Sequence, residues 1–407
     1  MKVWNSNFRM RRQTMPTALE ASPGERLRTL RDLLGLTGAD LHHLTGISQS
    51  WTSQVETGAR EPAEDRLRTI AEATDTPMSF FYAQPSSVPL DSLRFRKMAT
   101  ASRTVTRRIS AFYGESFRVT EEITGKAGYP APPLPFASSP DLSDRDIEEL
   151  AAQTREALRL APDKPIPHLT RALERAGISV APIVLPDPTG DAVSPTNKHF
   201  GVSYWAGIGE TALIAYFPGA QGDRDRFTLA HELGHLVLHT FRPRAADPEG
   251  EANRFAGALL VPYGRAREEI TDRLTLEGFA RRKQAWGVSI QALILRGAAV
   301  GNIDDSRKRS LYVQLTQRGW RKEEPVSVGQ EAPLLLWRLL QRQYGDKPYL
   351  RAADQLAIQP TILRSIAPQP VSNASFAGPD QPRADGKVVA FKPRSSRRGD
   401  DLRSTAP

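Results

Sequence analysis

The sequence predicts a multidomain protein, in which a small all-α bundle is followed by a larger, mainly helical α+β domain with a small sheet. Three observations predict this fold class. The chain has 407 residues, which is too long for one ordinary hydrophobic core. Helix start and stop signals recur at short intervals over residues 22–85. Longer helical patterns occupy most of residues 144–325 and enclose three short runs typical of strands.

The bundle is predicted from its capping residues. Residues 1–21 are polar, basic and unpatterned, so we expect a flexible arm there. The run SPGE at Ser22–Glu25 is a capping box with proline at the first helical position. Further capping residues and helix-ending glycines follow at Thr37, Ser48, Gly35, Gly46 and Gly58. These signals predict four or five short helices over residues 22–85.

The rest of the chain divides by composition and pattern. Residues 86–143 are first basic and then rich in proline and serine, so we interpret them as a linker. The patterned block at 144–325 is predicted as the second folded domain. After it we expect a C-terminal helical extension at 326–366. The last residues, 367–407, are rich in Pro, Ser, Ala and Arg without periodicity, and we expect a disordered tail.

Composition and charge restrict the class of protein. Fifty-five Lys and Arg against 46 Asp and Glu leave a formal charge of +9, which favours an anionic partner. The absence of cysteine excludes a disulfide framework, thiolate zinc sites and a cysteine nucleophile. No apolar run approaches the ~20 residues of a membrane span, and the N-terminal residues lack the apolar region of a secretory signal. We therefore expect a soluble cytoplasmic protein with no membrane partner.

The most informative segment is the run FTLAHELGHLVLH. His231 and His235 are four residues apart, so on a helix they lie on one face, where two imidazoles can bind one zinc ion. Glu232 lies one residue further round, where it can take a proton from a metal-bound water whose pKa zinc lowers toward ~7. The alternative is that the segment is an ordinary amphipathic helix with two buried histidines.

A catalytic zinc ion needs a third protein ligand and an open position. His239 lies ~12 Å along the helix from His231, too far to share an ion with it, so we interpret it as a helix-end histidine beside the macrodipole. Glu249 and Asn253 share a helical face, on which Glu249 could bind zinc while Asn253 orients a ligand. Glu251 points about 200° away and is predicted to be a solvated acid. The alternative is that Glu249, Glu251 and Asn253 simply lie on the exposed face of a helix and bind no metal.

The segment RFTLAHELGHLVLH followed by EGEANRFAGALLVP resembles the ImmA/IrrE family of zinc metallopeptidases, and the similarity covers about residues 145–325. The resemblance implies one zinc ion bound by His231, His235 and Glu249, with Glu232 of the HExxH motif as the general base. Members of this family typically act on a DNA-binding repressor. We therefore expect a zinc-dependent endopeptidase that cleaves such a repressor and so controls transcription, in a stress response or on a mobile element.

The bundle resembles the XRE class of phage-repressor-type helix-turn-helix domains, on the run LRTLRDLLGLTGADLHHLTGISQSWTSQVETGAREP. In such a domain the third helix enters the major groove of DNA. Glutamine can bind adenine edges, and serine can contact phosphate or base. The residues that would face operator-like DNA are Gln49, Ser50, Trp51, Ser53 and Gln54.

Three positions depart from the XRE pattern. Gly38 stands where a glutamine is usual, Thr52 stands where an apolar core residue is usual, and Trp51 would put a bulky ring on the side that faces the groove. The bundle also holds nine acidic residues and six arginines, whereas binding to phosphate favours a positive surface. The alternative is a bundle that binds a repressor or another protein rather than DNA.

Two functions follow from these patterns. The first is a regulatory zinc endopeptidase whose bundle brings it to DNA or to its substrate. The second is a metal-sensing transcriptional regulator of the XRE class that cleaves nothing. The presence of Glu232 favours catalysis, because a sensor needs no base at that position.

Overall fold

The computed structural model describes residues 22–89, 103–185, 201–219, 221–242 and 245–370. The expected arm and the expected tail beyond residue 370 lie outside these ranges. Over the described residues the chain forms sixteen α-helices, one 3-10 helix and one three-stranded sheet, so the predicted fold class is confirmed. In that same part of the chain, no helix is long and apolar enough to cross a bilayer.

The N-terminal bundle forms where the capping residues predict it. Ser22 accepts a hydrogen bond from the backbone of Glu25, and Thr37 forms a complete capping box with Asp40. Its apolar core includes Leu30, which is almost fully buried. The elements of the bundle are α1 (Pro23–Leu34), α2 (Gly38–Thr45), α3 (Gln49–Glu56), α4 (Glu64–Ala73) and the 3-10 helix η1 (Met78–Tyr82).

The interpretation of residues 86–143 as a linker is wrong for its central part, which forms the long helix α5 (Arg103–Lys126). This helix has an apolar stripe at helical spacing that enters the core. The basic composition of the segment concealed that stripe, because an average over the segment ignores which face each residue occupies. The buried side chains of the stripe are Ile109, Phe112, Tyr113, Phe117 and Ile123.

A buried ion pair joins α5 to the bundle. Arg26 of α1 donates from both terminal nitrogens to Glu115 of α5, with Nη2 lying 3.2 Å from Oε2. Its Nε also donates to the carbonyl oxygen of Phe80 at 3.0 Å. The side chains of Arg26 and Glu115 are only 1% and 2% exposed, so the charge of Arg26 depends on Glu115 for compensation, while Glu115 also pairs with Arg118 at 2.9 Å.

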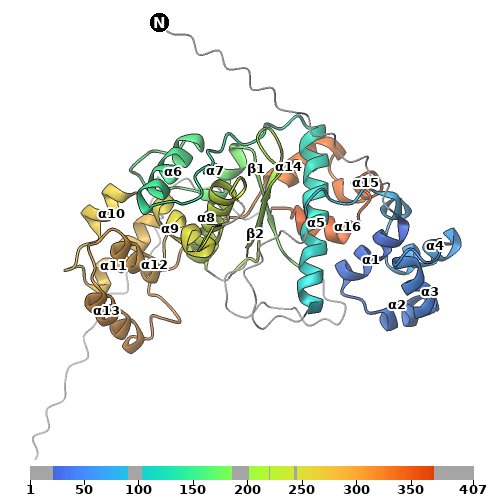
Figure 1. Ribbon diagram of the computed structural model, residues 1–407, viewed down its shortest axis with the longest axis horizontal. Coiled ribbons are helices and arrows are strands. Elements are labelled where there is room, and N and C mark those ends of the chain that lie inside the picture. The colour runs from blue at the N-terminus through green and yellow to red at the C-terminus, as the bar shows by residue number, and fades with distance from the viewer. Residues whose placement is uncertain (1–21, 90–102, 186–200, 220, 243–244, 371–407) are drawn as a thin grey trace, which may run out of the picture. The chain divides into compact units, whose positions relative to one another are not determined.

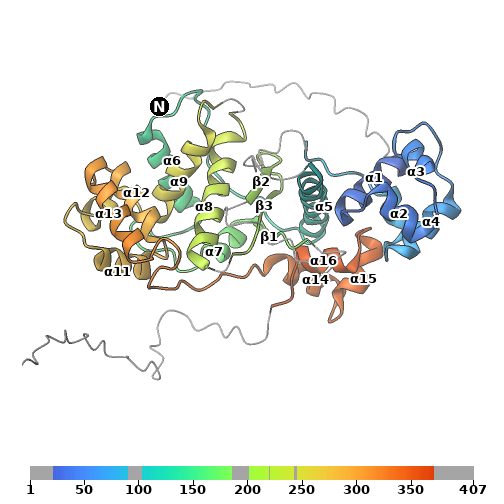
Figure 2. The ribbon, with the colours of Figure 1, turned by 90° about the horizontal axis from the view of Figure 1, so that it is seen from below.

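The small sheet has β3 (Ala212–Tyr216) at its centre, with β1 (Ile178–Pro182) parallel to it and β2 (Gly201–Trp205) antiparallel. All five residues of β3 are buried, so both faces of the sheet are covered. Alternate residues of β3 enter two different cores, because side chains alternate across a strand. Helix α8 (Gly222–His239) covers one face and α5 the other, as Figure 1 and Figure 2 show.

The remaining helices form two layers, one with α8 on its side of the sheet, called the first layer, and one with α5 on the other side. Helix α9 (Pro248–Leu260) packs on α8, and α6 (Asp144–Ala157) packs on α9, on the side of α8 away from the sheet. The first layer also holds α7 (Leu169–Arg175), α10 (Tyr263–Glu269), α11 (Leu276–Trp286), α12 (Ile290–Ala299) and α13 (Asp305–Gln317). The predicted C-terminal extension forms α14 (Leu335–Tyr344), α15 (Pro348–Gln355) and α16 (Pro360–Ile366), whose apolar residues join the core of α5.

Glu331, which precedes α14, connects the C-terminal extension to the first layer by polar contacts. It forms an ion pair with Arg226 of α8 and accepts a hydrogen bond from the backbone nitrogen of Thr170 at 2.7 Å. Burial alone would raise the pKa of Glu331, but hydrogen bonding to His168 and the charge of Arg226 lower it to about 2. The ionised carboxylate therefore stabilises the folded state.

We expect Glu331→Gln to lower the free energy of unfolding by about 3 kcal/mol at pH 7 and by about half as much at pH 3. The folded-state pKa of Glu331 is depressed, so its contribution is complete above the unfolded-state pKa of ~4.3 and is lost as pH falls toward 2. Urea denaturation at the two pH values measures both figures. Glu64→Gln, in an exposed pair with Arg68, should change little at either pH. An equal loss at both pH values for Glu331→Gln would contradict the ionic role.

Candidate metal centre

Two helices bring three possible metal ligands together. His231 and His235 lie one turn apart on α8, with their Nε2 atoms 3.1 Å from each other. Glu249, in the first turn of α9, reaches both rings: its carboxylate oxygens lie 3.4 Å from His231 Nε2 and 3.5 Å from His235 Nε2. The potential ligand atoms of this trio all lie within 4.8 Å of one another.

The spacing of these atoms fits a zinc ion. Zinc binds nitrogen and oxygen ligands tetrahedrally at about 2.0–2.1 Å, so neighbouring ligand atoms should be about 3.3–3.4 Å apart. The two Nε2 atoms are 3.1 Å apart, and each has its own oxygen of Glu249 close to that distance, Oε2 at 3.4 Å from His231 and Oε1 at 3.5 Å from His235. Hydrogen bonds from His231 and His235 also hold the pKa of Glu249 well below its usual range, so the carboxylate is ionised at neutral pH. An anionic carboxylate with two imidazoles is a common ligand set for catalytic zinc.

The close approach of α8 and α9 depends on Gly234. A Cβ atom at this position would lie 3.2 Å from Ala252 Cα and 3.1 Å from the ring of Phe255. Both distances are tighter than ordinary van der Waals contact, and Ala252 Cα belongs to the backbone of α9. The glycine between the two histidines therefore allows α9 to lie near enough for Glu249 to reach them.

Glu232 lies outside the trio and is held by the edge strand β2. Its side chain is buried, and the hydroxyl of Ser203 donates to its Oε2 at 2.7 Å. Gly201 on the same strand gives it space, because a Cβ atom there would lie 2.5 Å from Glu232 Cγ. Sequence analysis did not identify Ser203. The alternation of the strand could have indicated it, since Gly201, Ser203 and Trp205 share one face of β2.

Asn253 makes the contact that its predicted orienting role requires. Its Oδ1 lies 3.0 Å from His231 Nδ1. If His231 Nδ1 carries the proton and donates it to Asn253, then Nε2 has a free lone pair that points toward Glu249 and the ion. This assignment follows from the hydrogen-bond network.

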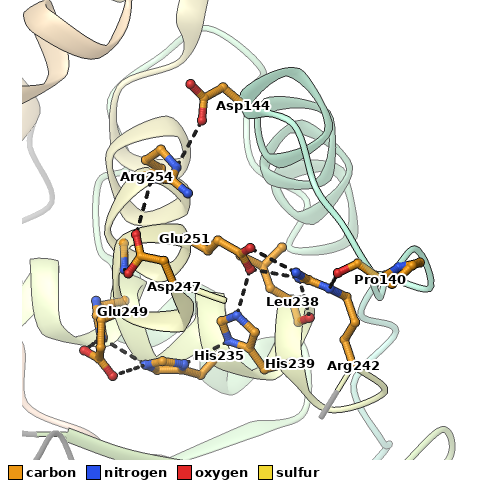
Figure 3. Close-up of polar contacts among 12 residues, drawn as sticks. Pro140, Asp144, His235, Leu238, His239, Arg242, Asp247, Glu249, Glu251 and Arg254 are labelled. Carbon is orange, nitrogen blue, oxygen red and sulfur yellow. Dashed lines mark hydrogen bonds and ion pairs between the residues drawn. The ribbon is translucent and has the colours of Figure 1, made fainter. Parts of the chain in front are cut away.

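The interpretation of Glu251 as a solvated acid is wrong. His239 is the last residue of α8, as predicted, but it has side-chain partners that the sequence did not indicate. Glu251 is only 6% exposed, because it points toward the C-terminal end of α8 rather than to solvent. It accepts hydrogen bonds from Arg242 at 2.8 and 2.9 Å and lies 3.1 Å from His239 Nε2. His239 Nδ1 in turn lies 3.0 Å from His235 Nδ1, so a chain of polar contacts runs from Arg242 to His235, as Figure 3 shows.

This chain of contacts has a defined direction when His235 binds a metal through Nε2. His235 Nδ1 then carries a proton and donates it to His239 Nδ1. His239 must carry its own proton on Nε2, from which it donates to Glu251. Arg242 compensates the charge of the Glu251 carboxylate. Each group in the chain has a partner of the correct kind, so the network can fix the tautomer and the ring orientation of His235.

The bundle exposes four of the five residues predicted to face DNA. Gln49, Ser50, Ser53 and Gln54 are exposed on α3. The prediction for Trp51 is wrong, because its side chain is only 2% exposed and lies in the core of the bundle. Trp51 and Val55 are four residues apart and share the buried face of α3, where the ring also lies 5.1 Å from the guanidinium carbon of Arg66.

Comparison with known proteins identifies two domains in the chain. A peptidase-family model described as the IrrE N-terminal-like domain matches residues 174–296, which include the whole trio. A model described as a helix-turn-helix domain matches residues 24–78. The chain therefore carries a helix-turn-helix domain followed by a domain of the metallopeptidase type, as the sequence predicts.

The chain is also similar to a transcriptional regulator. It is 25% identical over 404 residues to the HTH-type transcriptional regulator PrpR of Mycobacterium tuberculosis, and the match covers 89% of this chain and 79% of that protein. The similarity thus includes both domains.

We expect His239→Phe to weaken zinc binding about 10- to 100-fold, because it keeps a ring but removes the acceptor for His235 Nδ1. His239→Gln should lose much less, since an amide can both accept from His235 and donate to Glu251. Competition with a chromogenic chelator measures the zinc affinity of both variants. Equal affinities for the two variants would show that the ring only fills space.

Proposed function

We propose that this protein is a zinc-dependent endopeptidase whose helix-turn-helix domain brings it to DNA. The metal ligands are His231, His235 and Glu249, and Glu232 is the general base. The observation that carries the proposal is the position of Glu232, a buried carboxylate beside the trio that is held by Ser203. The match of residues 174–296 to a peptidase family supports it independently.

The residues of the site divide the chemistry between them. Zinc, when bound, lowers the pKa of a water molecule and polarises a peptide carbonyl. Glu232 takes the proton of the attacking water and delivers it to the leaving amine. The hydrogen bond from Ser203 fixes the carboxylate of Glu232 for this transfer. Strand β2 lies at an edge of the sheet, so its backbone can pair with an extended peptide beside the site.

The substrate in this proposal is a DNA-binding repressor, whose cleavage changes transcription in a stress response or on a mobile element. The presence of a helix-turn-helix domain in the same chain supports it, because binding near an operator would concentrate the peptidase where its substrate binds. On α3, the exposed side chains of Gln49, Ser50, Ser53 and Gln54 are the candidates for contact with DNA.

A second candidate function is a metal-sensing transcriptional regulator without proteolytic activity. The similarity to a protein named as a transcriptional regulator favours it. In that case the ion would control the fold or the DNA affinity, and Glu232 would have no chemical role. The hydrogen bond from Ser203 to Glu232 favours the peptidase, because it orients a carboxylate that a sensor does not need.

Glu232→Gln should abolish cleavage and leave the zinc content unchanged, because glutamine keeps the shape of the side chain but cannot accept the proton. Mass spectrometry of new N-termini compares cells that express the wild type with cells that express the variant. A fragment of a DNA-binding protein that appears only with the wild type is the expected result. Identical sets of N-termini under several stresses, with zinc in both purified proteins, would contradict the peptidase and favour the sensor.

Gln49→Ala with Gln54→Ala should weaken binding to DNA by at least about tenfold, since each glutamine–base contact contributes ~1–3 kcal/mol. The probe is DNA that the wild type selects from a random pool, and its affinity is measured by fluorescence anisotropy. The matched control is Gln153→Ala with Gln341→Ala, which removes two exposed glutamines from other helices. Failure of the wild type to select any sequence would indicate a bundle that binds protein rather than DNA.

A further inference from the structure

A cavity of about 670 Å³ adjoins the metal centre. It lies between the start of α8, the middle of α9, helix α12 and the segment that follows α13. Asn253 lines this cavity, and its Oδ1 lies 3.0 Å from His231 Nδ1. One side chain therefore belongs both to the wall of the cavity and to the surroundings of a proposed zinc ligand.

The wall of the cavity is basic. It contains five Arg and Lys side chains and two acidic ones, and one of the five, the buried Arg296, is paired with Glu148. Arg224 and Lys322 form no ion pair with any residue in the described part of the chain. Arg254 pairs with two exposed carboxylates, Asp144 at 3.0 Å and Asp247 at 3.8 Å, which Figure 3 also shows.

The two acidic residues of the wall neutralise only part of this positive charge. Asp223 and Glu324 both bind the buried ammonium group of Lys283, at 2.9 and 2.7 Å, so one of their two negative charges is compensated inside the protein. Glu324 also accepts from the backbone nitrogen of Ile290. The remaining negative charge is smaller than the charge of Arg224, Lys322 and Arg321, so the charge available to a ligand is positive.

The wall also offers apolar surface. Leu295 is 53% exposed although it lines the cavity, and Phe227 lines it as well. The volume is far larger than a single inorganic anion needs, so the ligand should carry both negative charge and apolar groups. A peptide segment with acidic and aliphatic side chains has this chemistry, and an endopeptidase must hold such a segment next to its metal.

We propose that this cavity binds an acidic segment of the peptide substrate, on one side of the bond that is cleaved. The inference rests on the proposed function, because it assigns the ligand to the substrate of the same metal centre. Arg224, Arg254 and Lys322 bind the carboxylates of the segment, and Leu295 contacts its apolar side chains.

The test compares two charge-reversed proteins with the wild type. Arg224→Glu with Lys322→Glu changes the cavity, and Arg281→Glu with Arg309→Glu makes the same change in net charge at exposed positions outside it. A peptide library prepared from a digested proteome gives the cleavage-site preference of each protein. We expect the wild type and the control to prefer sites flanked by Asp or Glu, and the cavity variant to cleave those sites at least about tenfold less while it still cleaves neutral sites.

A binding measurement separates this inference from the proposed function. In the Glu232→Gln background, fluorescence anisotropy measures the affinity for a labelled peptide taken from the cleaved acidic set and for its Gln-substituted analogue. The cavity variant should bind the acidic peptide at least about tenfold more weakly and the analogue equally. Cleavage without acidic preference, or equal effects in cavity and control variants, would overturn the inference alone. Binding of inorganic phosphate in the cavity that leaves the peptide affinity unchanged would also overturn it, and no cleavage by the wild type would overturn both.

Discussion

The close packing of α8 against α9 is the constraint on which the proposed metal centre depends. Neither helix supplies all three proposed ligands, because two of them lie on α8 and the third lies on α9. Gly234 allows the helices to approach at the level of the two histidines, where a methyl group would meet the backbone of Ala252. A shift of about one ångström would take Glu249 out of reach of the ion, since metal–ligand distances vary by only ~0.2 Å.

Partial burial then gives the site its rigidity. Helix α8 lies between the sheet and α9, so the buried side chains of His231, Glu232 and His239 need partners in the protein, while His235 and Glu249 stay partly exposed. Those partners come from three different elements: Ser203 holds Glu232, Asn253 contacts His231, and the His239–Glu251–Arg242 chain contacts His235. Such support keeps ligands and base in place before an ion or a peptide binds.

Local geometry explains which features the sequence could predict. The spacing of His231 and His235 and the caps at Ser22 and Thr37 are set within one or two helical turns, so they can be predicted without tertiary information. The alternation of β2 could place Ser203 on one face of the strand, but its contact with Glu232 could not be predicted, because it depends on how β2 packs on α8. The same reason applies to Glu251, whose exposure was predicted from α9 alone. Two predictions are wrong for another reason: the linker in place of α5, and the position of Trp51 toward DNA. Each was based on composition or on the family pattern, and not on which residues form the apolar face of the helix.

In the proposed function, His231, His235 and Glu249 bind one zinc ion in the folded protein. The most direct test measures zinc by mass spectrometry in the purified wild type and in Glu249→Gln, with circular dichroism to establish that both are folded. We expect about one zinc ion per chain in the wild type and much less in the variant, because an amide is a far weaker ligand than a carboxylate. A folded variant that retains a full equivalent of zinc would contradict the ligand set and with it the role assigned to the packing of α9.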